Sequence, residues 1–144
     1  MSEFDLELFL PFRLHQTAES VSQNFRPIYK NAEGLSRTEW RVLAHLGQYG
    51  ALTASEIGRR AGLHKTKVSR AVHSLETRRW LTRTTDPHDR RIQTLDLTRA
   101  GSRTYARLGQ LAAEHNAALV AQLGQQDFER LLSLLGKLSQ QPGA

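Results

Sequence analysis

The spacing of hydrophobic residues along the chain predicts a mostly helical protein. Two S/T-x-x-E capping boxes, which begin at Ser36 and Thr53, each stand before apolar residues at helical spacing. A longer helix upstream is expected to hold Pro11 in its first turn and to kink near its end at Pro27. The helices are expected over residues 11–31, 36–48, 53–61, 63–79, 98–123 and 126–139.

Two segments between these helices have the pattern of β-strands. Residues 81–85 are rich in β-branched side chains, and residues 91–97 alternate between two faces. The four residues from Asp86 to Asp89 have the composition of a turn. We therefore expect a β-hairpin, followed at once by Thr98 as the N-cap of the next helix. The last five residues, 140–144, are expected to fray.

The segment 63–79 has two unlike faces. Val68, Ala71, Val72 and Leu75 fall on one helical stripe, which predicts a buried side. At about 100° per residue, the face opposite this stripe is cationic and hydrogen-bonding, with no acid and no bulky apolar residue. Its residues are Thr66, Lys67, Ser69, Arg70, His73 and Thr77. Such a face suits the major groove of DNA, where arginine binds guanine, small hydroxyls approach bases and lysine binds phosphates. The other interpretation is an ordinary solvated helix face.

The positive charge of the chain is concentrated around this segment. The whole chain of 144 residues has a net charge of +6, whereas residues 59–91 alone hold ten Lys or Arg and only three acidic residues. A surplus confined to 33 consecutive residues indicates a polyanionic partner rather than a general aid to solubility.

Other features exclude several classes of protein. The chain has no cysteine, so it has no disulfide, no thiolate metal site and no thiol-based oxidation switch. No apolar run approaches the roughly 18 residues of a membrane span, and residues 4–12 lack the basic start of a signal peptide. We therefore expect a cytoplasmic protein with no membrane partner.

The order of these elements predicts a winged helix-turn-helix. A short helix, a tight turn at Gly62 and a second helix with a cationic face form the helix-turn-helix, and the basic hairpin after it forms the wing. The terminal helices carry too many leucines to stand alone in water, so we expect them to pack against a second subunit. A core formed within one chain is the alternative.

At this point the sequence resembles the MarR family of bacterial transcription regulators. The resemblance covers nearly the whole chain, and its most specific part is Asp89-Arg90-Arg91-Ile92-Gln93-Thr94-Leu95-Asp96-Leu97-Thr98-Arg99-Ala100-Gly101. This run is similar to the family's wing signature, Asp-x-Arg followed by a strand that ends Leu-Thr-x-x-Gly. The run from Ala61 to Arg70 is similar to the start of the family's recognition helix. His64 departs from the Asp or Ser that is common there, and imidazole is a poorer N-cap unless its Nδ1 accepts an amide.

The resemblance implies three segments: a dimerisation helix in 1–35, a DNA-binding lobe in 36–98 and dimerisation helices in 99–144. It implies that Arg91 in the wing reaches a minor groove and that Asp89 holds this arginine or the nearby backbone. Thr66, Ser69 and Arg70 would face bases, and Lys65, Lys67 and Arg83 would lie near phosphates. The expected DNA-binding residues are Lys65, Thr66, Lys67, Ser69, Arg70, His73, Arg83, Arg90 and Arg91.

The same resemblance implies a homodimeric repressor on a pseudo-palindromic operator, released by a small ligand. The family's pocket would correspond to Arg13, His15 and Gln16 on the first helix and to Trp40, Arg41 and His45 on the second. An arginine beside a tryptophan could hold an aromatic carboxylate or its thioester. In the alternative interpretation, Trp40 is core and Arg41 is ion-paired with Glu39 or Glu33.

Other functions find less support in the sequence. Zinc binding by His15, His45 and His115 lacks any pair at helical ligand spacing, so no metal or other cofactor is expected. No nucleophile elbow, phosphate loop or His-Glu-x-x-His motif indicates an enzyme. A ligand-independent architectural DNA-binding protein and a winged helix that binds only proteins remain as alternatives.

Overall fold

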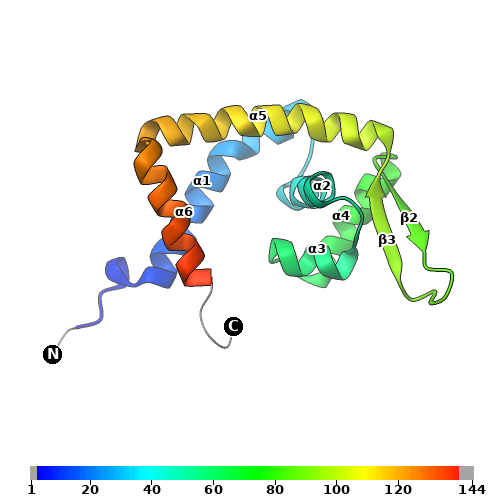
Figure 1. Ribbon diagram of the computed structural model, residues 1–144, viewed down its shortest axis with the longest axis horizontal. Coiled ribbons are helices and arrows are strands. Elements are labelled where there is room, and N and C mark those ends of the chain that lie inside the picture. The colour runs from blue at the N-terminus through cyan, green and yellow to red at the C-terminus, as the bar shows by residue number, and fades with distance from the viewer. Residues whose placement is uncertain (1–2, 140–144) are drawn as a thin grey trace. The chain divides into compact units, whose positions relative to one another are not determined.

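The computed structural model describes residues 3–139, and most of them lie in helices. A 3₁₀ turn at Leu6–Leu8 precedes α1 at Leu10–Glu33 and α2 at Arg37–Tyr49. The strand β1 at Leu52–Thr53, the helix α3 at Ala54–Ala61 and the helix α4 at Lys65–Thr77 follow. The hairpin strands β2 at Leu81–Thr85 and β3 at Gln93–Leu97 lead into α5 at Arg99–Leu123 and α6 at Gln125–Ser139 (Figure 1). Residues 140–144, for which fraying was expected, lie outside the described part.

The predicted helix boundaries are confirmed to within a few residues because local signals set them. Both capping boxes form, with the hydroxyls of Ser36 and Thr53 accepting the amides of Glu39 and Glu56. Pro11 lies in the first turn of α1, and the helix continues through Pro27 to a left-handed Gly34 at φ 67°. Thr98 caps α5 by accepting the amide of Gly101.

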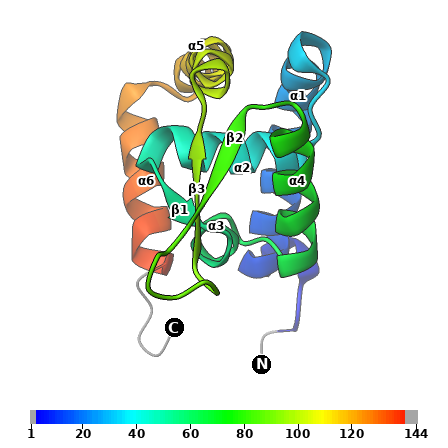
Figure 2. The same cartoon turned by 90° about the vertical axis from the view of Figure 1, so that its right-hand side faces the viewer.

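The wing belongs to a three-stranded antiparallel sheet in the order β1-β3-β2, whereas the sequence predicted two strands. Leu95 of β3 lies between Leu52 of β1 and Arg83 of β2 in the register. The strand β1 has two residues, so it is too short to show a period of two. Figure 2 shows the wing strands in front of α2 and α3, with α4 beside them.

The chain divides into two compact units, residues 1–109 and 110–144, with the boundary inside α5. The first unit contains α1, the lobe of α2 to α4, the sheet and the start of α5. Its core includes Leu43, Ile57, Leu75, Leu95 and Leu108, each less than 2% exposed. The three functional segments expected from the sequence divide the chain by role rather than by packing, and they remain a prediction.

Apolar side chains remain exposed near both termini. In the first unit, Phe4 is 73% exposed and Leu8 is 81% exposed. In the second unit, α6 has no buried residue, and Leu132 is 52% exposed. The packing of these residues against a second subunit stays a prediction.

Gly101 lies directly against the backbone of Trp80. A Cβ at this position would overlap the carbonyl oxygen of Trp80, which accepts the amide of Thr98. The Gly at the end of the wing signature therefore allows α5 to leave the sheet directly beside the strand β2.

We expect Gly101→Ala to lower the free energy of unfolding by about 1–3 kcal/mol, because backbone must shift to admit the methyl group. Urea denaturation followed by circular dichroism measures this change. Gly109→Ala is the matched control in the same helix, since its added Cβ meets no atom within 4 Å. The control should gain up to about 1 kcal/mol from helix propensity. Equal stabilities of the two variants would contradict the steric argument.

Candidate nucleic-acid interface

The helix α4 begins at a histidine cap. Gly62 ends α3 in the left-handed conformation at φ 65°, and the chain turns through Leu63 into α4. The Nδ1 atom of His64 accepts the amide of Thr66 at 3.2 Å. This bond meets the condition under which imidazole can replace the usual Asp or Ser cap. Because Nδ1 accepts, a neutral His64 carries its proton on Nε2.

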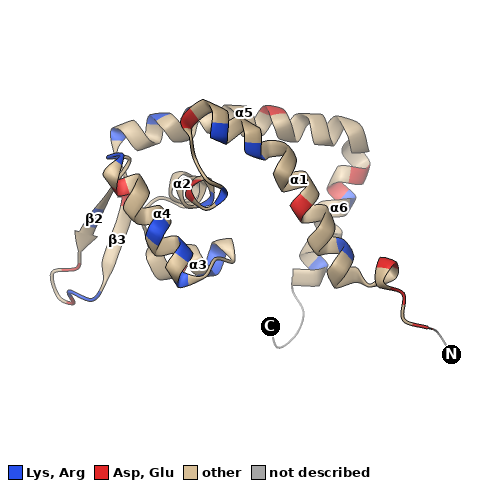
Figure 3. Cartoon of the chain, turned by 180° about the vertical axis from the view of Figure 1, so that it is seen from behind, with Lys and Arg blue, Asp and Glu red and all other residues tan. Residues whose placement is uncertain are grey.

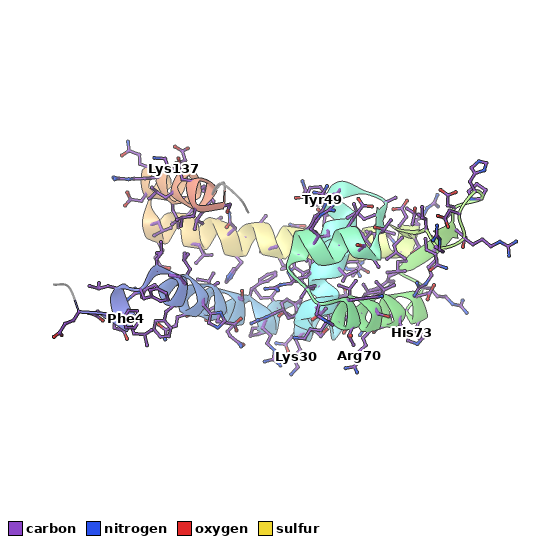
Figure 4. All side chains as sticks on the ribbon, turned by 90° about the horizontal axis from the view of Figure 1, so that it is seen from below. Phe4, Lys30, Tyr49, Arg70, His73 and Lys137 are labelled. Atoms are coloured by element: carbon purple, nitrogen blue, oxygen red, sulfur yellow. The ribbon has the colours of Figure 1, made fainter. Side chains whose placement is uncertain are left out.

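The two faces predicted for α4 are present. Val68, Ala71, Val72 and Leu75 are all buried, with exposed fractions of 4% or less. The opposite side chains are exposed: Lys65, Thr66, Lys67, Ser69, Arg70 and His73. Arg70 and His73 project from the same edge of the molecule in Figure 4. The outward surface of the helix is therefore formed by groups that can bind bases and phosphates.

The loop of the wing is ordered by two aspartates. The carboxylate of Asp86 accepts the amides of His88 at 2.7 Å and of Asp89 at 3.2 Å. Asp89 in turn accepts the backbone amide of Arg91 at 3.0 Å and two bonds from its guanidinium at 3.0 and 3.1 Å. These bonds from Arg91 lower the pKa of Asp89. The Arg91 side chain stays 90% exposed, so Asp89 holds it at the surface without covering it.

Arg83 and Arg90 occupy different environments. Arg90 is exposed in the wing loop, as a residue that contacts DNA must be. Arg83 donates to both carboxylate oxygens of Glu76 on α4, at 3.2 and 3.0 Å, and to the side chain of Gln93 on β3 at 3.2 Å. Its charge is thus partly balanced within the chain, and it joins α4 to the wing. The expected phosphate contact for Arg83 remains untested.

Sequence reasoning missed a polar network that fixes the end of α4. Arg78 donates to the carbonyls of Glu33 at 2.7 Å and Gly34 at 3.1 Å, where α1 ends. Its Nε lies 3.9 Å from the carboxylate of Glu39, which accepts the hydroxyl of Ser74 at 2.7 Å. The network therefore connects the end of α1, the start of α2 and the last turns of α4. The capping box revealed one role of Glu39, but its contacts with α4 depend on the tertiary fold.

The pKa of Glu39 is lowered in this network. Burial alone would raise it, but the hydrogen bonds from Ser74 and Ser36 and the charge of Arg78 outweigh this effect. The ionised carboxylate is therefore the form that the network stabilises.

Of the six expected ligand-binding residues, the structure brings two to one small cavity. Trp40 and Arg41 line a space of about 80 Å³ together with Ser22, Phe25, Tyr29 and Arg37. The Trp40 ring meets Phe25 edge-on at 5.6 Å and is stacked with Tyr29 at 6.3 Å between centroids. Trp40 thus packs α2 against α1, as the core interpretation expects.

The other four residues lie outside the lining of this cavity. Arg13 is 3.9 Å from the carboxylate of Glu7, and His15 and Gln16 are exposed on α1. His45 donates from Nδ1 to the carbonyl of Arg41 at 2.6 Å, so this nitrogen is not available to a ligand.

The alternative ion pairs for Arg41 are not formed. Glu39 binds Ser36, Ser74 and Arg78, and Glu33 binds Arg107 at 2.8 Å. The charge of Arg41 instead helps to lower the pKa of Glu19, after the larger effect of the Glu19–Arg37 hydrogen bond.

Comparison with known proteins agrees with this geometry. A sequence profile of the MarR family matches residues 33–92, which span α2, α3, α4, the strand β2 and the wing loop. Over these residues the chain is similar to the MarR family. The chain is 27% identical over 113 residues to the uncharacterised HTH-type transcriptional regulator YcgE of Bacillus subtilis (strain 168), covering 78% of this chain and 73% of the relative.

Two solved structures extend the likeness to almost the full length. The MarR family transcriptional regulator SPO1453 from Silicibacter pomeroyi DSS-3 has 26% identity and a TM-score of 0.81, over 94% of this chain and 96% of its own. The PcaV transcriptional regulator from Streptomyces coelicolor, in complex with its natural ligand, has 26% identity and a TM-score of 0.73, over 96% and 97%. These relatives are transcriptional regulators, and the chain shares the winged-helix fold of the two solved structures.

The described residues contain neither a cluster of metal ligands nor a membrane-spanning helix. No group of three or more His, Asp or Glu side chains within residues 3–139 could hold a metal ion. None of the described helices has the length and apolarity needed to cross a membrane.

We expect Glu39→Gln to lower the free energy of unfolding at pH 7 by about 1.5 kcal/mol, because it weakens hydrogen bonds that involve a charged group. In the unfolded chain Glu39 titrates near its ordinary pKa of 4.5, whereas in the folded chain the pKa is lower. The stabilisation of the fold by the ionised Glu39 carboxylate is therefore complete above the unfolded pKa and is lost as the pH falls through the folded pKa. Urea titrations at a series of decreasing pH values should show the difference from wild type becoming smaller.

Glu114→Gln is the control, since Glu114 is exposed on α5. It should change the stability little at any pH. If the loss of unfolding free energy in Glu39→Gln stays constant down to acid pH, then the shape of the Glu39 side chain, and not its charge, explains how it stabilises the fold.

Proposed function

We propose that this protein is a transcriptional regulator similar to those of the MarR family, and that it acts as a sequence-specific DNA-binding repressor and a homodimer. The observation that carries the proposal is the outward face of α4, where Arg70 is exposed opposite a buried apolar stripe and Lys67 and Ser69 are exposed on either side of it. A helix held in this way can enter a major groove without exposing its core side.

Each exposed group has a role that its chemistry fits. Arg70 binds guanine with two hydrogen bonds, and the hydroxyls of Thr66 and Ser69 approach neighbouring bases. Lys65 and Lys67 bind phosphates, which position the helix without reading the sequence. His73 lies further along the same face of α4.

The wing adds a second contact with DNA. Arg91 inserts into a minor groove, where a narrow A·T-rich segment concentrates negative potential. Asp89 fixes the direction of this side chain, and Arg90 binds the adjacent backbone.

The exposed apolar residues of the terminal segments support a dimer. Regulators of the MarR family bind DNA as dimers. In this chain, the N-terminal segment exposes Phe4 and Leu8, and α6 exposes Leu131 and Leu132. A second copy that covers these residues places two recognition helices about 34 Å apart, in successive major grooves of a pseudo-palindrome.

A small aromatic carboxylate, or its thioester, is the proposed effector. Arg37, Arg41 and three aromatic rings surround the cavity beside Trp40, and arginine can hold a carboxylate while the indole packs on an aromatic ring. The volume of about 80 Å³ is below the roughly 300–1,000 Å³ of ordinary ligand pockets. Binding therefore requires the Trp40 ring to move, and this movement shifts α2 relative to α1 and weakens DNA binding. The solved neighbour PcaV also carries a natural ligand.

The experiment that tests the function is fluorescence anisotropy on DNA from upstream of the protein's own gene, with scrambled DNA as the comparison. Binding should be tight, selective, steeply salt-dependent and made by two chains per operator. Equal affinity for scrambled DNA would favour the ligand-independent architectural protein. Absence of salt-dependent binding would favour a winged helix that binds only proteins.

We expect Arg70→Ala to reduce the discrimination between operator and scrambled DNA, at a cost of about 1–3 kcal/mol for the operator. Lys67→Ala should weaken binding to both DNAs alike. It should also make the salt slope, which is the slope of log affinity against log salt concentration, less steep by about one per bound chain. Anisotropy titrations at several salt concentrations measure both effects. Identical behaviour of the two variants would contradict the separation of base reading from phosphate binding.

We expect one aromatic acid from a panel to release the wild-type protein from its operator and to quench Trp fluorescence. Arg41→Ala should bind the operator with unchanged affinity and lose the response to that acid at least tenfold, because the carboxylate loses its charged partner. His15→Ala, on the exposed surface of α1 outside the cavity, is the control. Full response in Arg41→Ala would remove Arg41 from the proposed site.

A further inference from the structure

The helix α1 carries a basic groove that lies outside both the helix-turn-helix motif and the wing. The α1 groove has a volume of about 760 Å³ and runs along the C-terminal half of the helix to the start of α2. The residues that matter for the argument are Gln23, Arg26, Lys30, Asn31, Ser36 and Arg37. Gln23, Arg26 and Lys30 follow helical spacing, so α1 presents them on one side.

The α1 groove continues into the surface beside α4. A second hollow of about 220 Å³ shares Ser36 and Glu39 with it and is also lined by Lys67 and Arg70. Lys30 and Arg70 project from the same edge of the first unit in Figure 4. Figure 3 likewise shows basic positions on both α1 and α4. The cationic surface therefore does not end at the recognition helix.

Two of the cations in the α1 groove have no partner in the described part of the chain. Neither Arg26 nor Lys30 lies within 4.0 Å of a carboxylate among residues 3–139, and both side chains are exposed. Arg37 is different, since it donates to both oxygens of Glu19 at 2.8 and 3.2 Å. The single acid in the lining, Glu39, is bound to Ser74 and lies against Arg78. The net charge offered to a ligand is thus positive.

We propose that Arg26 and Lys30 bind phosphates of the DNA backbone beside the major groove that α4 reads. The inference rests on the proposed function, because it concerns the same DNA. A free monoanion would bind weakly to an open groove with two exposed cations, because surface ion pairs contribute little free energy in water. Binding to a DNA backbone is much more favourable, because each neutralised phosphate releases condensed counterions. Gln23 and Asn31 add side-chain amides that can donate to phosphate oxygens.

The first test uses the absence of cysteine from the chain. Lys30→Cys, labelled with an iron chelate that cuts nearby DNA, should cleave a bound duplex of about 30 base pairs, or three helical turns. Arg103→Cys is the matched control, since Arg103 is exposed on α5 away from its buried residues Gly101, Thr104 and Leu108. Cleavage by the Lys30 label at least tenfold above the Arg103 label supports the proposal. Equal or absent cleavage by the Lys30 label, in a variant that still binds the duplex, overturns it.

The second test removes charge without a label. The double variant Arg26→Gln and Lys30→Gln should make the salt slope of binding less steep by about 1.8 per bound chain, at about 0.9 for each phosphate. Selectivity for the operator should stay unchanged, because these residues read no bases. Arg99→Gln with Arg103→Gln removes the same charge from exposed positions on α5 and should leave the slope as in wild type.

The outcomes separate this inference from the function on which it rests. An unchanged slope in the α1 variant, or an equal change in the α5 control, would overturn the inference and leave DNA binding intact. If the wild-type protein binds neither the DNA from upstream of its own gene nor the scrambled DNA, both this inference and the proposed function are wrong.

Discussion

Burial of one stripe of α4 is the constraint on which the rest of the lobe depends. Val68, Ala71, Val72 and Leu75 can leave water only by packing inside the lobe formed by α2, α3 and the sheet. Because α4 is a straight helix with one apolar side, this packing fixes which side chains face outward. The cationic face of α4 is therefore a consequence of the core, and a change in the core would rotate or displace it.

The positive charge of residues 59–91 serves two purposes that the sequence alone cannot separate. Arg60 stacks over the ring of Tyr49 at 4.6 Å, Arg78 joins α4 to the end of α1, and Arg83 joins α4 to the wing through Glu76. These arginines stabilise the lobe. Lys65, Lys67 and Arg70 are exposed on α4 and remain available to a polyanion. Basic composition thus predicted a polyanionic partner, but it overstated how many of these cations are free to bind one.

The connection between α1 and the lobe bears on both proposals. Trp40, Phe25 and Tyr29 pack α2 against α1, while Arg78 binds the carbonyls at the end of α1. A ligand that moved Trp40 would act on this junction, and the α1 groove lies at the same junction on the surface. Regulation by a ligand and backbone binding by α1 would therefore depend on the same packing of one helix against another.

Local sequence patterns predicted the helix boundaries, the two faces of α4, the hairpin and the resemblance to the MarR family. Capping boxes, helical periodicity and the wing signature act over a few residues, so they are visible in one chain. The cap bond of His64, the strand β1, the partners of Arg83 and the Arg78 network were decided by the tertiary structure. These contacts join residues that are distant in sequence, or depend on one side-chain orientation, and no local pattern encodes them. The expected ligand residues show the same limit, since only Trp40 and Arg41 meet at one cavity and Arg13, His15, Gln16 and His45 do not.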